Sequence, residues 1–153
     1  ALQGKGKIIF AGNGGSFGDS QHLATEFISR FKMDRNPLPA IALGTNSSSL
    51  TAIGNDFGFD QVFSRELKAI AQPKDIFIPI STSGNSENII QASISAKQQN
   101  MSVIGLMGGD GGRLKPLVDM PIIVPSTTTA RIQEAHMLIY HWWCEMLDEV
   151  ADD

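Results

Sequence analysis

The chain has 153 residues, with 12 Lys and Arg against 16 Asp and Glu, which gives a formal charge of −4. This length fits one domain, and the composition of 42% apolar and 18% charged residues is typical of a folded globular protein. The excess of acidic residues argues against a surface that binds nucleic acid or an anionic membrane. No apolar run has the roughly 18 residues that a membrane span needs, and no secretory signal is visible. The single cysteine, Cys144, cannot form an internal disulfide. We therefore expect a cytoplasmic location.

Strand and helix patterns alternate along the chain. The first strand is predicted at 7–11, an apolar run that ends at glycines, and the first helix at 18–32, where Leu23 and Phe27 recur at helical spacing. Then follow strand 40–43, helices 48–53 and 61–71, strand 75–80, helix 86–99, strands 103–106 and 121–124, and helix 129–150. This alternation predicts a single α/β domain, a doubly wound parallel sheet of five strands with helices on both faces.

The loop after the first strand reads Gly12-Asn13-Gly14-Gly15-Ser16. Its glycines do not have the G-x-G-x-x-G spacing of a dinucleotide site, and no carboxylate follows the second strand to hold a ribose. No G-x-x-x-x-G-K-[ST] segment occurs either, which disfavours a nucleotide site of the P-loop type. What remains is a turn whose backbone N–H groups can approach a polar ligand, or simply a tight connection between strand and helix.

The loop after the third strand is rich in hydroxyl groups. It reads Ser81-Thr82-Ser83-Gly84-Asn85-Ser86 and precedes a predicted helix. Helix N-termini bind anions through free N–H groups and the helix dipole. An ordinary N-cap needs only one serine, so this loop predicts a phosphate site without a fixed positive charge.

Two helices carry polar side chains suited to metal binding or proton transfer. His22 and Glu26 are four residues apart and share one face of the first helix. The last helix offers Gln133, Glu134, His136 and His141, although a polar stripe there is also typical of a solvated or subunit-contact face. Asn55-Asp56-Phe57, which we predict to form a turn, adds a possible carboxylate at the same rim.

Five separated segments carry a resemblance to a known family: GNGGS, DSQHLATE, LTAIGNDFGFD, ISTSGNS and ARIQEAHMLIYH. Together they resemble the phosphoheptose isomerases, sugar isomerase (SIS) domain enzymes that convert sedoheptulose 7-phosphate to a heptose 7-phosphate. The resemblance covers nearly the whole chain, so we expect one SIS domain over residues 1–153. It implies a flavodoxin-like sheet and a homotetramer whose active sites lie where subunits meet.

The resemblance also implies roles for individual residues, residue by residue. The substrate would be contacted by Asn13, Gly14, Gly15, Glu26, Asn55, Asp56 and Gln133, and its phosphate by Ser81, Thr82, Ser83 and Ser86. A zinc ion would be coordinated by His22, Glu26, Gln133 and His141, with Glu26 and His141 as the acid–base residues. Glu134 and His136 match the family segment without an implied role. No nucleotide cofactor is expected.

The expected chemistry is consistent with these residue types. Converting a ketose to an aldose removes a proton from C1, passes through an enediol and returns a proton at C2. A carboxylate such as Glu26 can carry that proton while an imidazole such as His141 serves the oxygens. Zinc with nitrogen and oxygen ligands would polarise the carbonyl. The implied product is D-glycero-D-manno-heptose 7-phosphate, in the first step of nucleotide-heptose biosynthesis for the cell-surface glycans of a bacterium.

Two features depart from the family pattern. Its members begin with a helical segment that joins the oligomer core, and we expect this chain to have almost none of it. Phe17 also stands where smaller residues are usual, so we expect a narrower mouth to the site.

Two other functions remain open at this point. A non-catalytic SIS module, either a sugar-phosphate sensor or a relative that associates with a replication initiator, would keep the glycine turn and lose the carboxylate and the terminal-helix imidazole. The presence of Glu26 and His141 favours the enzyme. An isomerase of an amino-sugar phosphate would share the hydroxyl-rich loop but not the full set of four ligands.

Overall fold

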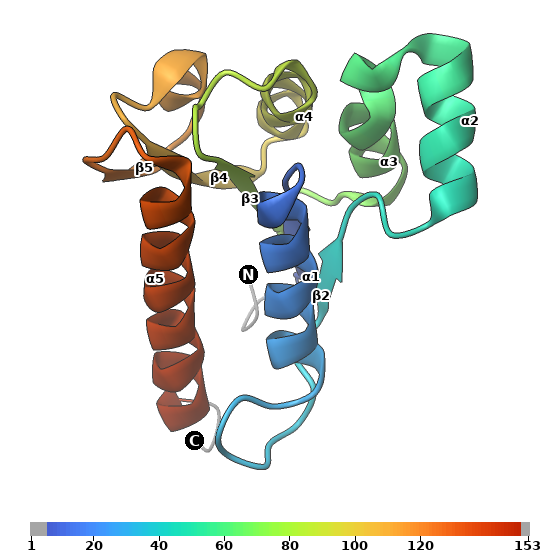
Figure 1. Cartoon of the computed structure of the whole chain (residues 1–153). Helices are drawn as coiled ribbons and strands as arrows, with labels where there is room; N and C mark the ends of the chain where they lie inside the picture. The colour runs from blue at the N-terminus through green and yellow to red at the C-terminus, as the bar shows by residue number, and fades with distance from the viewer. Residues whose placement is uncertain (1–5, 151–153) are drawn as a thin grey trace.

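A computed structural model describes residues 6–150 and shows one sheet of five parallel strands (Figure 1). The strands are β1 (Ile8–Ala11), β2 (Ala40–Ala42), β3 (Ile76–Ser81), β4 (Ser102–Gly108) and β5 (Met120–Val124). Their order in the sheet is β2-β1-β3-β4-β5, and every neighbouring pair is parallel. The predicted α/β fold is therefore confirmed. Strand order reverses between β1 and β3, which places the loops that follow these two strands side by side, where ligands of such sheets bind.

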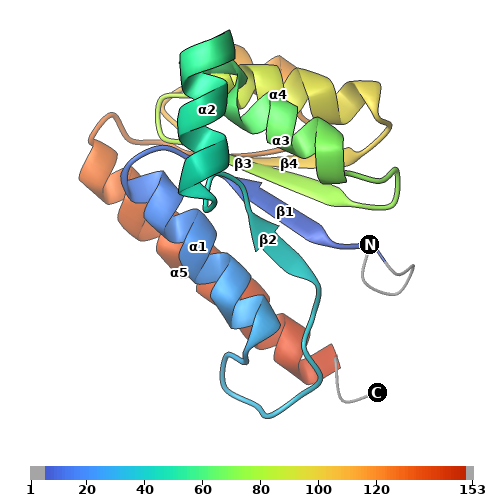
Figure 2. The same ribbon diagram turned by 90° about the vertical axis from the view of Figure 1, so that its right-hand side faces the viewer.

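Helices cover both faces of the sheet (Figure 2). They are α1 (Gly15–Ile28), α2 (Ser47–Phe57), α3 (Val62–Ile70), α4 (Glu87–Gln98) and α5 (Thr129–Val150), with short 3-10 segments η2 (Phe59–Gln61) and η3 (Gly112–Leu117). Helices α1 and α5 run along one face, and α2, α3 and α4 lie over the other. Within residues 6–150, no helix has both the length and the apolar character needed to cross a membrane.

The sheet separates two apolar cores. Residues of β1 alternate between them, because successive side chains of a strand point to opposite faces. Ile9 packs with residues of α3 and α4, whereas Phe10 packs with residues of α1 and α5. Strands buried on both faces read as continuous apolar runs, which is why KIIFA and DIFIPI were recognisable in the sequence.

Two of the predicted helices had wrong boundaries. Helix α1 begins at Gly15 rather than at 18 and ends at Ile28 rather than at 32, so residues 29–39 form a loop. Helix α2 continues to Phe57, so Asn55-Asp56-Phe57 forms its last turn and not a separate turn. None of the residues of α2 is fully buried, although Leu50 and Ile53 pack partly buried against the core. Gly58, with φ of 91°, ends the helix.

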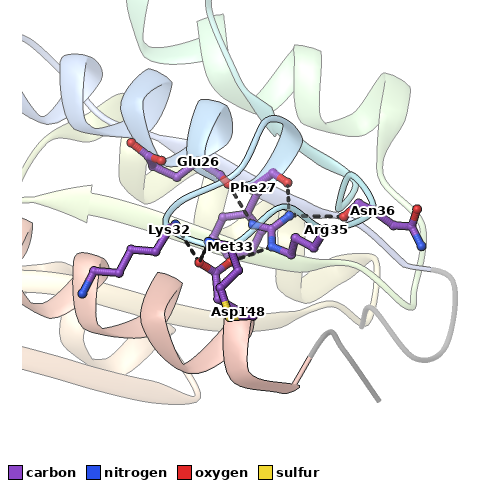
Figure 3. A network of polar contacts seen from close by, with 7 residues as sticks. All are labelled: Glu26, Phe27, Lys32, Met33, Arg35, Asn36 and Asp148. Atoms are coloured by element: carbon purple, nitrogen blue, oxygen red, sulfur yellow. Dashed lines mark hydrogen bonds and ion pairs between the residues drawn. The ribbon is translucent and has the colours of Figure 1, made fainter.

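The early end of α1 has a long-range cause. The guanidinium of Arg35 donates to the carbonyl oxygens of Glu26 and Phe27, at 2.9 and 3.0 Å, and so satisfies carbonyls in the last turn of α1 (Figure 3). Arg35 Nε also donates to Asp148 on α5, at 2.8 Å, and both side chains are almost fully buried. The backbone N–H groups of Lys32 and Met33 donate to the second oxygen of Asp148. The loop thereby fastens the end of α1 to the end of α5.

Candidate active site

The glycine turn after β1 is held against the start of α4. Asn13 and Asn88 exchange two amide hydrogen bonds of 2.9 Å each, and Asn88 is buried in the first turn of α4. Gly12 has no room for a side chain, because an added Cβ would lie 2.3 Å from the carbonyl oxygen of Ser16. Gly14, with φ of 55°, precedes the first residue of α1. The contact between Asn13 and Asn88 thus fixes the turn beside the hydroxyl-rich loop, and the sequence alone does not predict this contact.

The hydroxyl-rich loop lies above the N-terminus of α4. Ser81 Oγ donates to Ser86 Oγ at 3.3 Å, and Ser83 Oγ accepts from the backbone N–H of Asn85 at 3.1 Å. Ser86 is the N-cap residue, but its side chain makes no capping hydrogen bond. The backbone N–H of Ile89 donates to the carbonyl of Ser86 at 3.1 Å, so within residues 6–150 the N–H groups of Glu87 and Asn88 are those left available to an anion. This geometry is compatible with a bound phosphate, and the predicted phosphate contacts stay a prediction.

A second glycine-rich loop, 109–111, packs against the hydroxyl-rich loop. A Cβ on Gly84 would lie 2.0 Å from the carbonyl oxygen of Gly111, so the two backbones are in direct contact. The backbone N–H of Leu114 also donates to the carbonyl of Gly84 at 2.9 Å. The segment η3, which follows loop 109–111, was not predicted from the sequence.

The exchange between Asn13 and Asn88 provides a test of the loop arrangement. We expect Asn88→Leu to remove both hydrogen bonds, leave the Asn13 amide unsatisfied and cost about 1–3 kcal/mol of stability. Binding of a sugar phosphate should weaken as well, because the glycine turn loses its fixed position. Urea unfolding and calorimetric titration with a sugar phosphate measure the two effects. Normal ligand affinity in Asn88→Leu would show that the pair does not position the turn.

The predicted acid–base and metal-binding side chains meet where α1 packs against α5. His22 Nε2 lies 2.9 Å from Glu26 Oε1, and the ring centroids of His22 and His141 are 5.1 Å apart. Phe31 stacks on His141 with a centroid distance of 5.3 Å. The side chain of Glu26 is only 18% exposed, so its carboxylate is mostly shielded from water while remaining accessible at one edge. One chain thus brings His22, Glu26 and His141 together.

Behind this group lies a buried polar pair that the sequence analysis missed. Tyr140 donates its hydroxyl proton to Asp19 Oδ1 across 3.1 Å, and the same hydroxyl oxygen lies 3.2 Å from His22 Nδ1. Burial raises the pKa of Asp19, and the hydrogen bond from Tyr140 opposes that rise. Burial and the neighbouring Asp19 also raise the pKa of Tyr140. The only sequence signal was spacing, since Asp19 lies three residues before His22 and Tyr140 directly precedes His141.

Gln133 lies at the other end of this interface. An added Cβ on Gly15 would lie 2.1 Å from Gln133 Nε2, so the amide rests directly on the glycine turn. Within residues 6–150, no hydrogen bond joins Gln133 to His22, Glu26 or His141. Gln133 therefore lies against the glycine turn, and its predicted roles in substrate contact and as a metal ligand stay predictions.

Asn55 and Asp56 are not brought into this group. Both are exposed in the last turn of α2, where Asn55 Nδ2 donates to Asp56 Oδ1 at 2.8 Å. Figures 1 and 2 show α2 away from α5, over the opposite face of the sheet. Their predicted contact with substrate stays a prediction. Phe17, by contrast, lies near Gly44, where it is 3.2 Å from an added Cβ.

The donor types at the junction of α1 and α5 fit a zinc ion. Zinc in proteins takes imidazole nitrogen and carboxylate oxygen, and two imidazoles sharing one tetrahedral ion have ring centroids about 5 Å apart when the Zn–N bonds are about 2.0–2.1 Å. The rings of His22 and His141 have that separation. Across the described part of the chain, however, no group of three or more His, Cys, Asp or Glu is arranged to hold a metal. As they lie, His22 and Glu26 hydrogen-bond to each other instead.

Comparisons with known proteins decide the family. Residues 1–108 match the family model for the SIS domain. A phosphoheptose isomerase of Nitratiruptor sp. is 52% identical over 149 residues, which cover 97% of this chain and 80% of that protein. The phosphoheptose isomerase of Helicobacter pylori strain HPAG1 is 49% identical over 147 residues, covering 96% and 77%. The chain belongs to the phosphoheptose isomerase family of SIS-domain proteins.

Solved structures agree with this membership. The structure of the phosphoheptose isomerase GmhA from Neisseria gonorrhoeae matches with a TM-score of 0.90 and 46% identity, over 97% of this chain and 79% of that one. A phosphoheptose isomerase from Francisella tularensis matches with a TM-score of 0.93 and 42% identity, with the same coverage. As a member of this isomerase family, the protein is an enzyme, and its substrate class is a sugar phosphate.

Proposed function

We propose that this phosphoheptose isomerase family member converts sedoheptulose 7-phosphate to D-glycero-D-manno-heptose 7-phosphate. The observation that carries the proposal is the meeting of His22, Glu26 and His141 on α1 and α5, beside a glycine turn and a hydroxyl-rich loop suited to a phosphate. His22 follows Gly15 of the glycine turn by seven residues, about 10 Å along α1 at ~1.5 Å per residue.

In this proposal, phosphate binding and proton transfer are carried out by different residues. The hydroxyls of the 81–86 loop and the N-terminus of α4 hold the phosphate, which fixes the sugar relative to α1. The Glu26 carboxylate accepts a proton from C1 and returns it to C2 of the enediol. His141 moves protons between the two oxygens, and Phe31 keeps its ring in place by stacking.

The proposal includes a zinc ion held by His22, Glu26, Gln133 and His141. The donor types and the spacing of the two imidazole rings support it. When bound, zinc would supply a Lewis acid that polarises the substrate carbonyl. We further propose a cytoplasmic homotetramer with sites at subunit interfaces, and a product that enters nucleotide-heptose biosynthesis for cell-surface glycans.

Incubation of the protein with sedoheptulose 7-phosphate tests this function. We expect aldose product to form with zinc present, and its formation to stop on treatment with a chelator and resume on adding zinc back. Glucosamine 6-phosphate and arabinose 5-phosphate are tested separately as alternative substrates. Conversion of either of these without conversion of sedoheptulose 7-phosphate would contradict the proposed substrate, and full activity in the chelator would contradict the proposed metal.

A further inference from the structure

The polar pair behind His22 forms a continuous chain of contacts with it. Asp19 Oδ1 lies 3.1 Å from Tyr140 Oη, Tyr140 Oη lies 3.2 Å from His22 Nδ1, and His22 Nε2 lies 2.9 Å from Glu26 Oε1. Tyr140 is fully buried and Asp19 is 7% exposed. The chain therefore runs from the interior, between α1 and α5, to the partly open edge that carries Glu26.

The directions of these hydrogen bonds follow from the chemistry of the groups. An ionised carboxylate can only accept, and a phenol has a single proton to donate. Tyr140 gives that proton to Asp19, so its oxygen is left as an acceptor toward His22. The imidazole must then carry a proton on Nδ1, which it donates to Tyr140.

A proton on Nδ1 of His22 determines what Nε2 of the same ring presents to Glu26. When Nδ1 carries the proton of a neutral imidazole, Nε2 presents a lone pair to the carboxylate of Glu26. Two acceptors 2.9 Å apart need a cation between them, either a proton or a metal ion. Histidines that bind metals typically donate their other ring N–H to an acceptor behind them, which fixes the tautomer and the direction of the ring.

We propose that Asp19 and Tyr140 are positioning residues that keep the proton of His22 on Nδ1, so that Nε2 faces Glu26 and remains available to a cation. This deepens the proposed function, in which His22 is a zinc ligand, and it adds two residues that touch neither substrate nor metal. Asp19 Oδ2 has no hydrogen-bond partner among the described residues. A buried carboxylate with an unused oxygen costs stability, as expected of a group retained for its effect on a neighbour.

Imidazole NMR tests the proposal directly. The chain has three histidines, so long-range correlations between ring protons and ring nitrogens can be assigned to His22 in the protein labelled with nitrogen-15. We expect Nδ1 of His22 to be protonated in wild type, both without metal and with zinc added. In Tyr140→Phe, which keeps the buried ring, the proton should move to Nε2, where Glu26 accepts it. Asp19→Asn should permit the same change, because the amide can donate to Tyr140 and reverse the order.

Ser20→Ala is a matched control. Ser20 is also buried on α1 and donates to the carbonyl of Ser16 at 2.8 Å, away from His22. This variant removes a buried hydroxyl from the same helix and should leave the His22 tautomer unchanged. A wild-type His22 without a proton on Nδ1 would overturn the proposal, as would a Tyr140→Phe spectrum that shows Nδ1 still protonated.

Zinc affinity gives a second readout, measured by competition with a chelating dye. We expect Tyr140→Phe and Asp19→Asn to weaken zinc binding about 10–100-fold, and Ser20→Ala to leave it unchanged. Unchanged affinity in both positioning variants would overturn the proposal. A wild-type chain that binds no zinc would contradict the metal in the proposed function instead, and the tautomer of His22 would still decide the role of Asp19 and Tyr140.

Discussion

We expect Glu26→Gln to lower the turnover of sedoheptulose 7-phosphate by about 10²–10⁴-fold, the contribution typical of a general acid–base group. Glutamine has nearly the size of glutamate and can still hydrogen-bond to His22, but it cannot accept a proton from carbon. Affinity for the sugar phosphate should change little, because the phosphate loop lies on β3 and α4 and not on α1. Steady-state kinetics and calorimetric titration separate the two quantities.

Glu149→Gln is a suitable control for this experiment, since Glu149 is an exposed carboxylate in the last turn of α5. It should have wild-type turnover. Turnover of Glu26→Gln within about threefold of wild type would show that another group carries the proton. A large loss of sugar-phosphate affinity in Glu26→Gln would place the carboxylate in substrate binding and not in proton transfer.

We expect Asp148→Asn to lower the free energy of unfolding by about 3–5 kcal/mol at neutral pH, the cost typical of breaking a buried ion pair. The substitution leaves the buried guanidinium of Arg35 without its counter-charge. Burial alone would raise the pKa of Asp148, but the N–H groups of Met33 and Lys32 and the charge of Arg35 outweigh burial and lower it. Urea unfolding at pH 7 measures the loss.

The lowered pKa of Asp148 also predicts a pH dependence. An aspartate whose pKa is lower in the folded than in the unfolded state stabilises the fold above its unfolded pKa of about 3.9. That stabilisation is lost as the pH falls through the folded pKa. The difference in stability between wild type and Asp148→Asn should therefore shrink below about pH 4.

Glu134→Gln on the same helix is the matched control, because it breaks an exposed pair with Arg131 and should cost no more than about 1 kcal/mol. If Asp148→Asn costs no more than Glu134→Gln at pH 7, the buried pair does not fasten the two helices.

The parts of the fold that depend on local patterns could be predicted from the sequence. Strand β3 is an apolar run on both faces, and its loop carries four hydroxyls before a helix, so both the strand and the phosphate loop are visible in the residues themselves. The end of α1 could not be predicted, because it depends on Arg35 meeting Asp148 across 113 positions of the chain.

The same distinction applies to the site. The spacing of His22 and Glu26 on one helix is a local property, and the structure joins them as expected. The pairing of Asn13 with Asn88, and of Asp19 with Tyr140, depends on how elements far apart in the sequence pack together. Residues that position the side chains of a site are hard to recognise for this reason, because neither residue of such a pair lies in a recognisable sequence motif.

The loop 29–39 has a consequence for protein engineering. It is long, irregular and mostly exposed, and such loops are ordinarily preferred for inserting an affinity tag or for opening new termini in a circular permutant. Here its backbone and Arg35 hold the helices that carry His22 and His141. An insertion between Lys32 and Arg35 would therefore disturb the chemistry of a site to which the loop contributes no reacting group.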